Sequence, residues 1–438
     1  MRGSAAFRAA VAPGGVLAGP WVRNELWRRA RAVPSLDLRF AENKSLGDAV
    51  TGQSLVTFTR ASSGTYVGSD GLIKSATTDA PRFDHDPTTG ESLGLLVEES
   101  RTNLLLRSEE FDDAVWTNNT EVTANTTVSP AGTTTADTLA ISTAGVWLLE
   151  DVTIASGATL AFSIYAKANT TDWMLIRIGD TGATTYRNIW FDLSTGAVGT
   201  ESGLGAGVAS GVGSVQQSTN GFYRAVGVFE TSGLTTVRAQ IATVASDGSF
   251  TRTGSIYIWG AQLEADSFPT SYIPTTTATV TRAADVASIS GSNFSSWYRQ
   301  DEGTVFVGSY PAEFNQATGL ASFDDGTTSN RIQARFSNVG SAANVVSAGG
   351  SLQANYVTSN TGTAQALNKT AVAYKINDFA LVLNNGTVAS DTAGSVPASV
   401  DRLSIGNNAG ANPANYPIRR LTYWPQRLSN TTLQTLAQ

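Results

Sequence analysis

The sequence predicts an all-β protein built from tandem β-sandwiches, on three observations. Charged residues make up only 15% of the chain, while 42 glycines and many serines, threonines and asparagines separate short apolar runs, as in short strands joined by turns. Some runs alternate: Val237, Ala239 and Ile241 face one way while Arg238 and Gln240 face the other, which is typical of a sheet with one solvated side. With 438 residues, 41% of them hydrophobic, the chain can form two or three cores.

Residues 1–34 differ in composition from the rest and predict a basic N-terminal segment. They hold six arginines against one glutamate and are interrupted by Pro-Gly and Gly-Pro pairs. A short amphipathic helix would begin at Trp21, and we expect Trp21, Leu26 and Trp27 to dock onto another protein. A disordered tail and a targeting sequence are the alternatives, although the Gly and Pro breaks do not fit a secretory signal.

Residues 35–106 predict a small β-rich connector, because its apolar runs are short and Gly lies beside Ser and Asp as hairpin turns require. Residues 107–283 then give strand after strand at the spacing of a jelly-roll β-sandwich of the carbohydrate-binding-module type. The last of these strands, after Gly254, is apolar on both faces, so we expect it to be interior. A Pro-punctuated, Thr-rich tether follows it and ends near Asp285.

Residues 284–438 predict a second sandwich. Apolar and polar side chains separate onto two faces in Arg331–Phe336. The strand Ile418–Pro425 and the short helix after it are similar to the closing elements of concanavalin-like lectin sandwiches. Ser429 is the expected N-cap of that helix.

Several motifs resemble one family of proteins when they are taken together. They lie in the segments Phe58–Val67, Pro81–Pro87, Gly94–Leu104, Ser108–Phe111, Ile258–Glu264, Thr270–Thr275 and Thr281–Asp285. In combination they resemble the head-spike fibre and tail-fibre proteins of bacteriophages and of phage-derived gene transfer agents. The resemblance covers most of residues 36–285.

The resemblance implies a structural component of a virion, with the head spike preferred over the tail fibre. Expected partners are other virion proteins, at a capsid vertex or spike base, and the surface polysaccharide of a host cell to which the particle adsorbs. A homo-oligomer is expected, a trimer by analogy with other fibres, since several copies multiply weak single-site affinity. The expected location is the virion surface, and the extracellular space after release.

Composition excludes several other classes of function. There is no cysteine, so neither disulfides nor thiolate metal sites are available. The net charge is -7 with its positive part gathered at the N-terminus, so nucleic-acid binding is not expected from the acidic body. No apolar run approaches the roughly 20 residues that a membrane span needs, and we expect no membrane insertion.

Aromatic residues beside polar ones are the expected glycan-binding feature, because a sugar ring packs on a flat π surface while amides and carboxylates bind its hydroxyls. The candidates are Trp173, Tyr186, Asn188, Trp190, Asp192 and Tyr223. For each aromatic residue the alternative is a place in the core between two sheets.

Catalysis is not expected. The only histidine, His85, lies in a turn-like motif, and no G-x-S-x-G sequence accompanies it. A depolymerase would need two acids at a set separation, and the candidate pairs are Glu98 with Glu99, Asp112 with Asp113, and Asp324 with Asp325. No cofactor is expected; a structural calcium ion would use Asp84, Asp86, Asp324 or Asp325. A spacer or adaptor without glycan binding is the remaining alternative.

Overall fold

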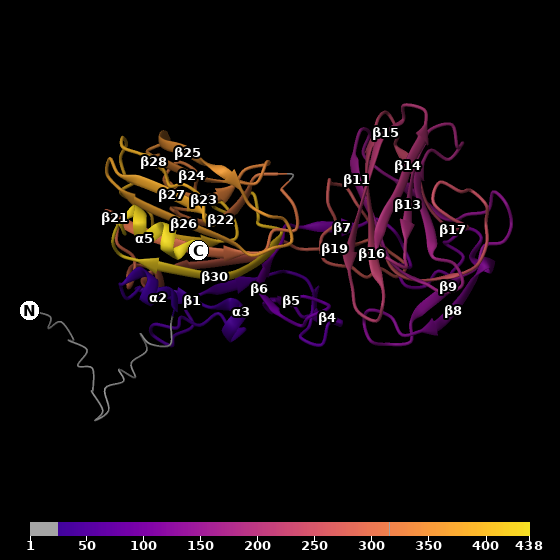
Figure 1. Cartoon of the computed structure of the whole chain (residues 1–438), viewed down its shortest axis with the longest axis horizontal. Helices are drawn as coiled ribbons and strands as arrows, with labels where there is room; N and C mark the ends of the chain where they lie inside the picture. The colour runs from indigo at the N-terminus through magenta and orange to yellow at the C-terminus, as the bar shows by residue number, and fades with distance from the viewer. Residues whose placement is uncertain (1–24, 315) are drawn as a thin grey trace, which may run out of the picture. The chain divides into compact units, whose positions relative to one another are not determined.

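The computed structural model describes residues 25–314 and 316–438 and confirms the all-β class. The chain divides into two compact units, Phe58–Asp285 and the residues up to Thr57 together with Val286–Gln438. We call them the central unit and the terminal unit. Both consist of antiparallel sheets with few helices (Figure 1).

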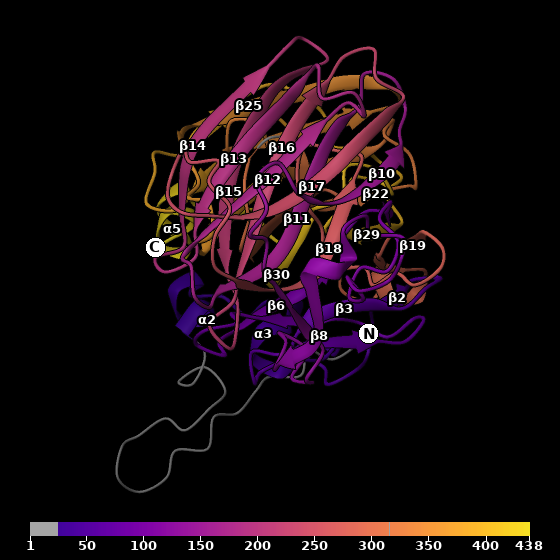
Figure 2. The same ribbon diagram turned by 90° about the vertical axis from the view of Figure 1, so that its right-hand side faces the viewer.

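Two sheets form the sandwich of the central unit. The five-stranded sheet has the order β10 (Leu148–Thr153), β17 (Thr236–Val244), β12 (Trp173–Gly179), β13 (Tyr186–Asp192) and β14 (Ala197–Leu204). The six-stranded sheet has the order β15 (Val208–Gln217), β16 (Tyr223–Thr231), β11 (Thr159–Ala168), β18 (Ile256–Glu264), β9 (Ala136–Leu139) and β8 (Val122–Thr127). Figure 2 looks onto the five-stranded sheet, with β14, β13, β12, β17 and β10 following one another across it.

The core of this sandwich follows the alternation of its strands. Met174, Ile176 and Ile178 of β12 have no exposed surface, and they pack with Phe162 and Ile164 of β11 in one apolar cluster. β18 is interior, as its two apolar faces predict, because it lies between β11 and β9. Burial of this apolar surface at about 25 cal/mol per Å² is the main stabilising contribution.

Short strands complete the central unit. They are β3 (Gly64–Val67), β4 (Ile73–Ala76), β5 (Phe83–His85), β6 (Ser92–Val97), β7 (Arg101–Asn103) and β19 (Val280–Arg282), with the 3-10 turn η1 (Asn119–Glu121). The strand β2 (Thr57–Thr59) spans the division between the two units. β3 pairs with β4, β5 with β6, and β7 with β19. The last pair joins the predicted connector to the predicted tether, so from Phe58 onward these two segments fold together within one unit.

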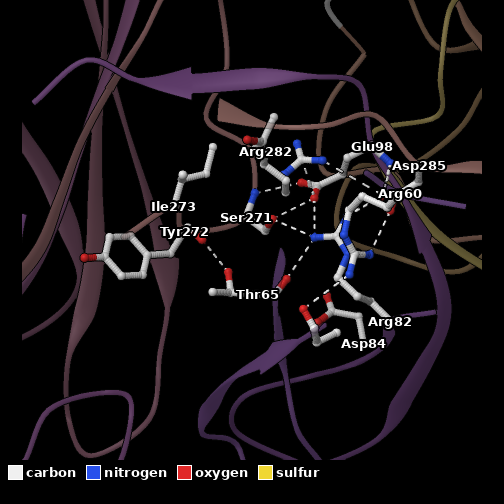
Figure 3. Close-up of polar contacts among 12 residues, drawn as sticks. Arg60, Thr65, Arg82, Asp84, Glu98, Ser271, Tyr272, Ile273, Arg282 and Asp285 are labelled. Atoms are coloured by element: carbon white, nitrogen blue, oxygen red, sulfur yellow. Dashed lines mark hydrogen bonds and ion pairs between the residues drawn. The ribbon is translucent and has the colours of Figure 1, made fainter. Parts of the chain in front are cut away.

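A buried ion network holds the connector and the tether together (Figure 3). Arg82 bonds to Glu98 at 2.7 Å and to Asp285, and Arg60 bonds to Asp285 at 3.1 Å. Arg282 lies 3.6 Å from Glu98. Glu98 also accepts a hydrogen bond from the backbone N–H of Ser271 at 2.7 Å. Burial opposes the ionised form of Glu98, but Arg282 and Arg82 outweigh it and lower its pKa to about 2.

The terminal unit is the second sandwich. One of its sheets contains β28 (Ala389–Asp391), β27 (Phe379–Leu383), β26 (Asn368–Lys375), β21 (Glu302–Ser309) and β30 (Tyr416–Trp424), with β1 (Leu36–Leu38) paired to β30. The other contains β20 (Val286–Ser290), β29 (Arg402–Ile405), β22 (Thr318–Asp324), β23 (Arg331–Phe336), β24 (Ser341–Ala348) and β25 (Ser351–Thr361). The N-terminal residues Leu36–Leu38 therefore belong to the C-terminal sandwich, which differs from the predicted 35–106 segment.

The helices of the terminal unit are short. They are α2 (Glu25–Ala30), α3 (Phe40–Asn43), α4 (Ser292–Ser295) and α5 (Asn430–Leu436). Ser429 caps α5 as predicted, since its hydroxyl accepts the N–H of Thr432 at 3.2 Å. No helix among the described residues is long and apolar enough to cross a membrane.

The prediction that Leu26 and Trp27 dock onto a partner needs correction. Leu26 is 8% exposed and packs in the core with Leu433 and Leu436 of α5. Trp27 is 6% exposed, and its indole N–H donates to Asp37 at 2.9 Å. The amphipathic turn was correctly predicted, but its apolar side covers this chain's own sheet. Trp21, the third predicted docking residue, lies outside the described residues.

Candidate functional site

One face of the five-stranded sheet gathers most of the predicted glycan-binding residues. Antiparallel pairing places Trp173 opposite Asp192, Arg177 opposite Asn188, and Gly179 opposite Tyr186. Directly paired residues share a face of a sheet. Met174, Ile176 and Ile178 point to the opposite face and into the core. We call the face with Arg177 and Tyr186 the site face; it belongs to the sheet seen in Figure 2.

A stack of two arginines and two aromatic rings lies on the site face. The Cζ atom of Arg177 lies 4.0 Å from the ring centre of Tyr186 and 4.1 Å from that of Trp147. Arg252 lies over Trp147 as well, at 4.2 Å. We call Arg252, Trp147, Arg177 and Tyr186 the arginine–aromatic stack. Guanidinium groups are attracted to the faces of aromatic rings, and more strongly where water is removed.

Amide side chains flank the stack. Nε of Arg177 donates to Oδ1 of Asn188 at 2.6 Å, and Nδ2 of Asn188 donates to the hydroxyl of Ser202 at 3.1 Å. On its other side Arg177 pairs across the sheet with Gln240 of β17. Nε of Arg252 donates to the carbonyl of Val146 at 3.0 Å. The stack is therefore held in place from two strands and two loops.

The charges of the two stacked arginines are balanced by no carboxylate of the described residues. Arg177 is 8% exposed and Arg252 is 7% exposed. Burial lowers the pKa of Arg177 to about 10, and burial together with the charge of Arg177 lowers that of Arg252 to about 10. On the adjacent row of the same face, Arg238 is paired with Asp151 through bonds of 2.7 Å and 2.8 Å.

Two of the predicted glycan contacts have structural roles instead. Trp190 is buried in the core cluster, its indole N–H donates to the carbonyl of Ser249 at 2.9 Å, and the ring of Phe250 lies against it. Asp192 closes the turn after β13, where it accepts hydrogen bonds from the N–H and hydroxyl of Ser194. A loop packs over Trp190, so this side chain does not present its ring to a ligand.

Tyr223 is the predicted contact that the structure separates from the others. It begins β16 in the six-stranded sheet and pairs with Ala166 of β11. Tyr223 therefore does not share the site face with Tyr186. Trp173 does share it and is partly buried against the core cluster.

Sequence reasoning missed four residues of the site: Trp147, Arg177, Gln240 and Arg252. The alternation in β17 contained the signal for Gln240, which lies on the face away from Val237, Ala239 and Ile241, whereas Arg177 shares its face of β12 with Trp173 and Leu175. Trp147 and Arg252 lie next to strand ends, outside any periodic run. Their positions depend on how loops fold over the sheet, which strand periodicity does not encode.

The acidic residues considered for catalysis or calcium lie elsewhere and bind protein groups. Asp86 accepts the N–H groups of Thr88 and Thr89 at 2.9 Å and 2.7 Å. Asp325 accepts the N–H of Thr327 at 3.0 Å. Asp84 is partly buried and accepts the N–H of Val67 at 2.7 Å; burial raises its pKa to about 7. Within residues 25–314 and 316–438 no three His, Asp or Glu side chains gather as a metal site.

The candidate acid pair Glu98 and Glu99 also binds protein groups. Glu98 belongs to the buried ion network, whereas its neighbour Glu99 bonds to Arg101. His85 is a buried strand residue whose Nδ1 lies 3.0 Å from the carbonyl of Val67. Glu98 and Glu99 lie between β6 and β7 and are held by different arginines.

An open groove of about 410 Å³ lies beside β7, away from the site face. Arg101 is its central charge, and this guanidinium already bonds to Glu99 and contacts Asp266 at 2.5 Å. Leu104 and Ala265 supply its apolar lining. No aromatic ring lines the groove, so it lacks the surface on which a sugar ring packs.

Comparison with known proteins gives fold-level likeness only. No family model and no curated protein matches the sequence. Similar solved structures include the CBM40 of Ruminococcus gnavus IT-sialidase bound to α2,3-sialyllactose (16% identity, TM-score 0.29, 33% of this chain and 86% of that one). Others are the NanB sialidase of Streptococcus pneumoniae (15%, 0.30, 34% and 26%) and the receptor-binding domain of botulinum neurotoxin mosaic serotype C/D (12%, 0.26, 35% and 39%). With such TM-scores, no ligand is transferred from them to this chain.

Proposed function

We propose that this chain is a non-enzymatic fibre component of a virion that binds host-cell surface polysaccharide through the site face of the central unit. The observation that carries the binding role is the arginine–aromatic stack with its flanking amides. Tyr186 is partly exposed beside Arg177, and Gln240 of β17 pairs with Arg177 across the sheet.

This combination of groups matches the chemistry of a sugar. The C–H face of a pyranose packs on a tyrosine ring, and hydroxyl groups accept hydrogen bonds from guanidinium and amide N–H groups. Because Arg177, Tyr186 and Gln240 stand on β12, β13 and β17, ladder pairing fixes their backbone positions. Fixed contacts lose less entropy when a ligand binds.

The acids near the stack support binding rather than hydrolysis. Asp151 is ion-paired with Arg238, and Asp192 closes a turn. A glycosidase needs two carboxyl groups facing each other across the scissile bond. The contacts that Asp151 and Asp192 make place neither of them in such an arrangement.

The virion role and the preference for a head spike rest on the resemblance of residues 36–285 to fibre proteins. So do the expected partners at a capsid vertex or spike base and the expected homo-oligomer. Several copies on one particle would raise the strength of attachment by linking weak single sites, in the way that multivalent binders do.

The test is size-exclusion chromatography with light scattering on the full chain mixed with host surface polysaccharide. Co-elution with polymer of unchanged length is the expected result, and the protein-only run reports the oligomer. Polymer that shortens with time would replace this function with that of a depolymerase. Failure to associate with any host polysaccharide would leave a spacer or adaptor.

A further inference from the structure

We infer that the site face selects acidic polysaccharides, with Arg177 as the residue that binds a sugar carboxylate and Arg252 as a second positive charge beside it. This inference rests on the proposed polysaccharide binding and adds the chemical class of the ligand.

The stack leaves only the edge of the Arg177 guanidinium open. Its Cζ lies over the rings of Tyr186 and Trp147, at 4.0 Å and 4.1 Å, so two rings contact the guanidinium. All of its N–H groups point outward in the plane of the group. Interaction with a ligand therefore takes place at that edge.

One part of the edge is occupied and the other is available. Nε donates to Asn188 at 2.6 Å. Among the described residues no acceptor binds the two η nitrogens of Arg177. Neither nitrogen is a fully buried atom that lacks a hydrogen-bond partner, so both are open to solvent. Two parallel N–H groups on one end of a guanidinium match the two oxygens of a carboxylate.

The charge balance favours an anion at this place. Two guanidinium groups share the ring of Trp147 at 4.1 Å and 4.2 Å, and the aromatic and amide groups around them are neutral. Burying a charge without a counter-ion is costly. Burial lowers the pKa of both arginines, which is the physical sign of this cost. A ligand carboxylate supplies the missing counter-charge.

Arg238 is a neighbouring arginine whose charge the protein itself balances. It lies on the same face, one row from Arg177, and Asp151 neutralises it through two hydrogen bonds. The contrast between a paired and an unpaired arginine on one face supports a ligand role for Arg177. It also provides a matched control.

The experiment compares two polymers that differ only in their carboxylates: polygalacturonate and its fully methyl-esterified form. Alginate, dextran and dextran sulfate are added as a second carboxylate polymer, a neutral polymer and a sulfated polymer. Binding to the full chain is measured by isothermal titration calorimetry for the wild type, Arg177→Gln, Arg177→Lys and the control Arg238→Gln. Circular dichroism melting establishes that each variant is folded.

The expected result is binding of the carboxylate polymers in preference to the ester and to dextran. Arg177→Gln should lose about tenfold or more in affinity for the carboxylate polymers, while Arg238→Gln should change it less than about twofold. Arg177→Lys should lie between them, because lysine keeps the charge but not the planar fork. Arg252→Gln should also weaken binding, and it serves as the second variant if Arg177→Gln does not fold.

Three results would overturn the inference while leaving polysaccharide binding intact. They are equal affinity for the acid and its ester, stronger binding of dextran sulfate than of either carboxylate polymer, and binding of the host polysaccharide without any of the carboxylate polymers. A folded Arg177→Gln protein with unchanged affinity would assign the stack to stability alone. Failure to bind any polymer, the host polysaccharide included, would remove the proposed function together with the inference.

Discussion

Arg177 and Tyr186 lie on neighbouring strands of one sheet, with the guanidinium carbon 4.0 Å from the centre of the tyrosine ring. Their backbones do not oppose each other directly, since Tyr186 pairs with Gly179 and Arg177 with Asn188. Glycine opposite Tyr186 is required, because a Cβ at position 179 would lie 2.8 Å from the Cβ of Tyr186. A small residue at this position thus leaves room for the ring that covers the arginine.

Removing the ring of Tyr186 should weaken polysaccharide binding without unfolding the sandwich. Tyr186→Ala deletes a partly exposed ring that both holds Arg177 and offers a surface to a sugar, so we expect affinity to fall by about tenfold. Tyr223→Ala is the control, because Tyr223 lies in the six-stranded sheet. Calorimetric titration with host polysaccharide measures both. Equal losses for the two variants would show that Tyr186 has no special role.

Replacing Glu150 should change how stability depends on pH. Burial raises the pKa of Glu150 from 4.5 to about 7, so the folded state holds this proton between those pH values and the unfolded state does not. The free energy of unfolding contributed by this group therefore falls as pH rises from about 4.5 to 7. Glu150→Gln should raise stability near pH 8 by about 1–3 kcal/mol and have little effect near pH 4.

Urea denaturation at several pH values measures the difference between Glu150→Gln and the wild type. Glu230→Gln is the control, because Glu230 is an exposed residue of β16. The explanation fails if the gain for Glu150→Gln is the same near pH 4 as near pH 8. It also fails if Glu230→Gln shows the same trend.

Breaking the buried ion network should destabilise the central unit far more than breaking an exposed ion pair. Arg82→Met leaves Glu98 and Asp285 with less positive charge in a buried place, at an expected cost of about 3–5 kcal/mol. Arg238→Met breaks the exposed pair with Asp151, at a cost below about 1 kcal/mol. Chemical denaturation near neutral pH compares them; similar costs would contradict a structural role for the network.

Trp27 should contribute to the stability of the terminal unit. Trp27→Ala removes a buried ring and its hydrogen bond to Asp37, and we expect a loss of about 3–5 kcal/mol. Glu25→Ala, at an exposed position of the same helix, should leave the melting temperature nearly unchanged. Differential scanning calorimetry is the measurement. An unchanged melting temperature for Trp27→Ala would contradict this structural role and favour the docking role that the sequence predicted.

The fold class was predictable from the sequence because strand periodicity is local. Alternation in β17 and the doubly apolar pattern of β18 gave the right strands and the right degree of burial. The division of the chain into the central and terminal units was not predictable in this way. Leu36–Leu38 pairs with Leu421–Tyr423, almost 400 residues away. A three-residue strand is too short to indicate which strand it pairs with.

The residues of the site face were predicted only in part. Tyr186 and Asn188 were candidates because aromatic residues lie beside polar ones in this stretch, and the structure places both on the site face. Trp190 was misjudged because it points to the site face, yet the loop at Ser249 and Phe250 covers it. Arg177 was overlooked because an arginine inside an apolar run reads as a solvated strand position, and only its two flanking rings distinguish it.

Hydrogen–deuterium exchange of the full chain with and without host surface polysaccharide tests the central claim most directly, because it locates the contact. We predict that the polysaccharide slows exchange in β12, β13 and β17 and in the loops that contain Trp147 and Arg252, with β8 and β9 of the other sheet unchanged. Protection confined to the terminal unit, or binding without protection of the site face, would contradict the claim that this face holds the glycan.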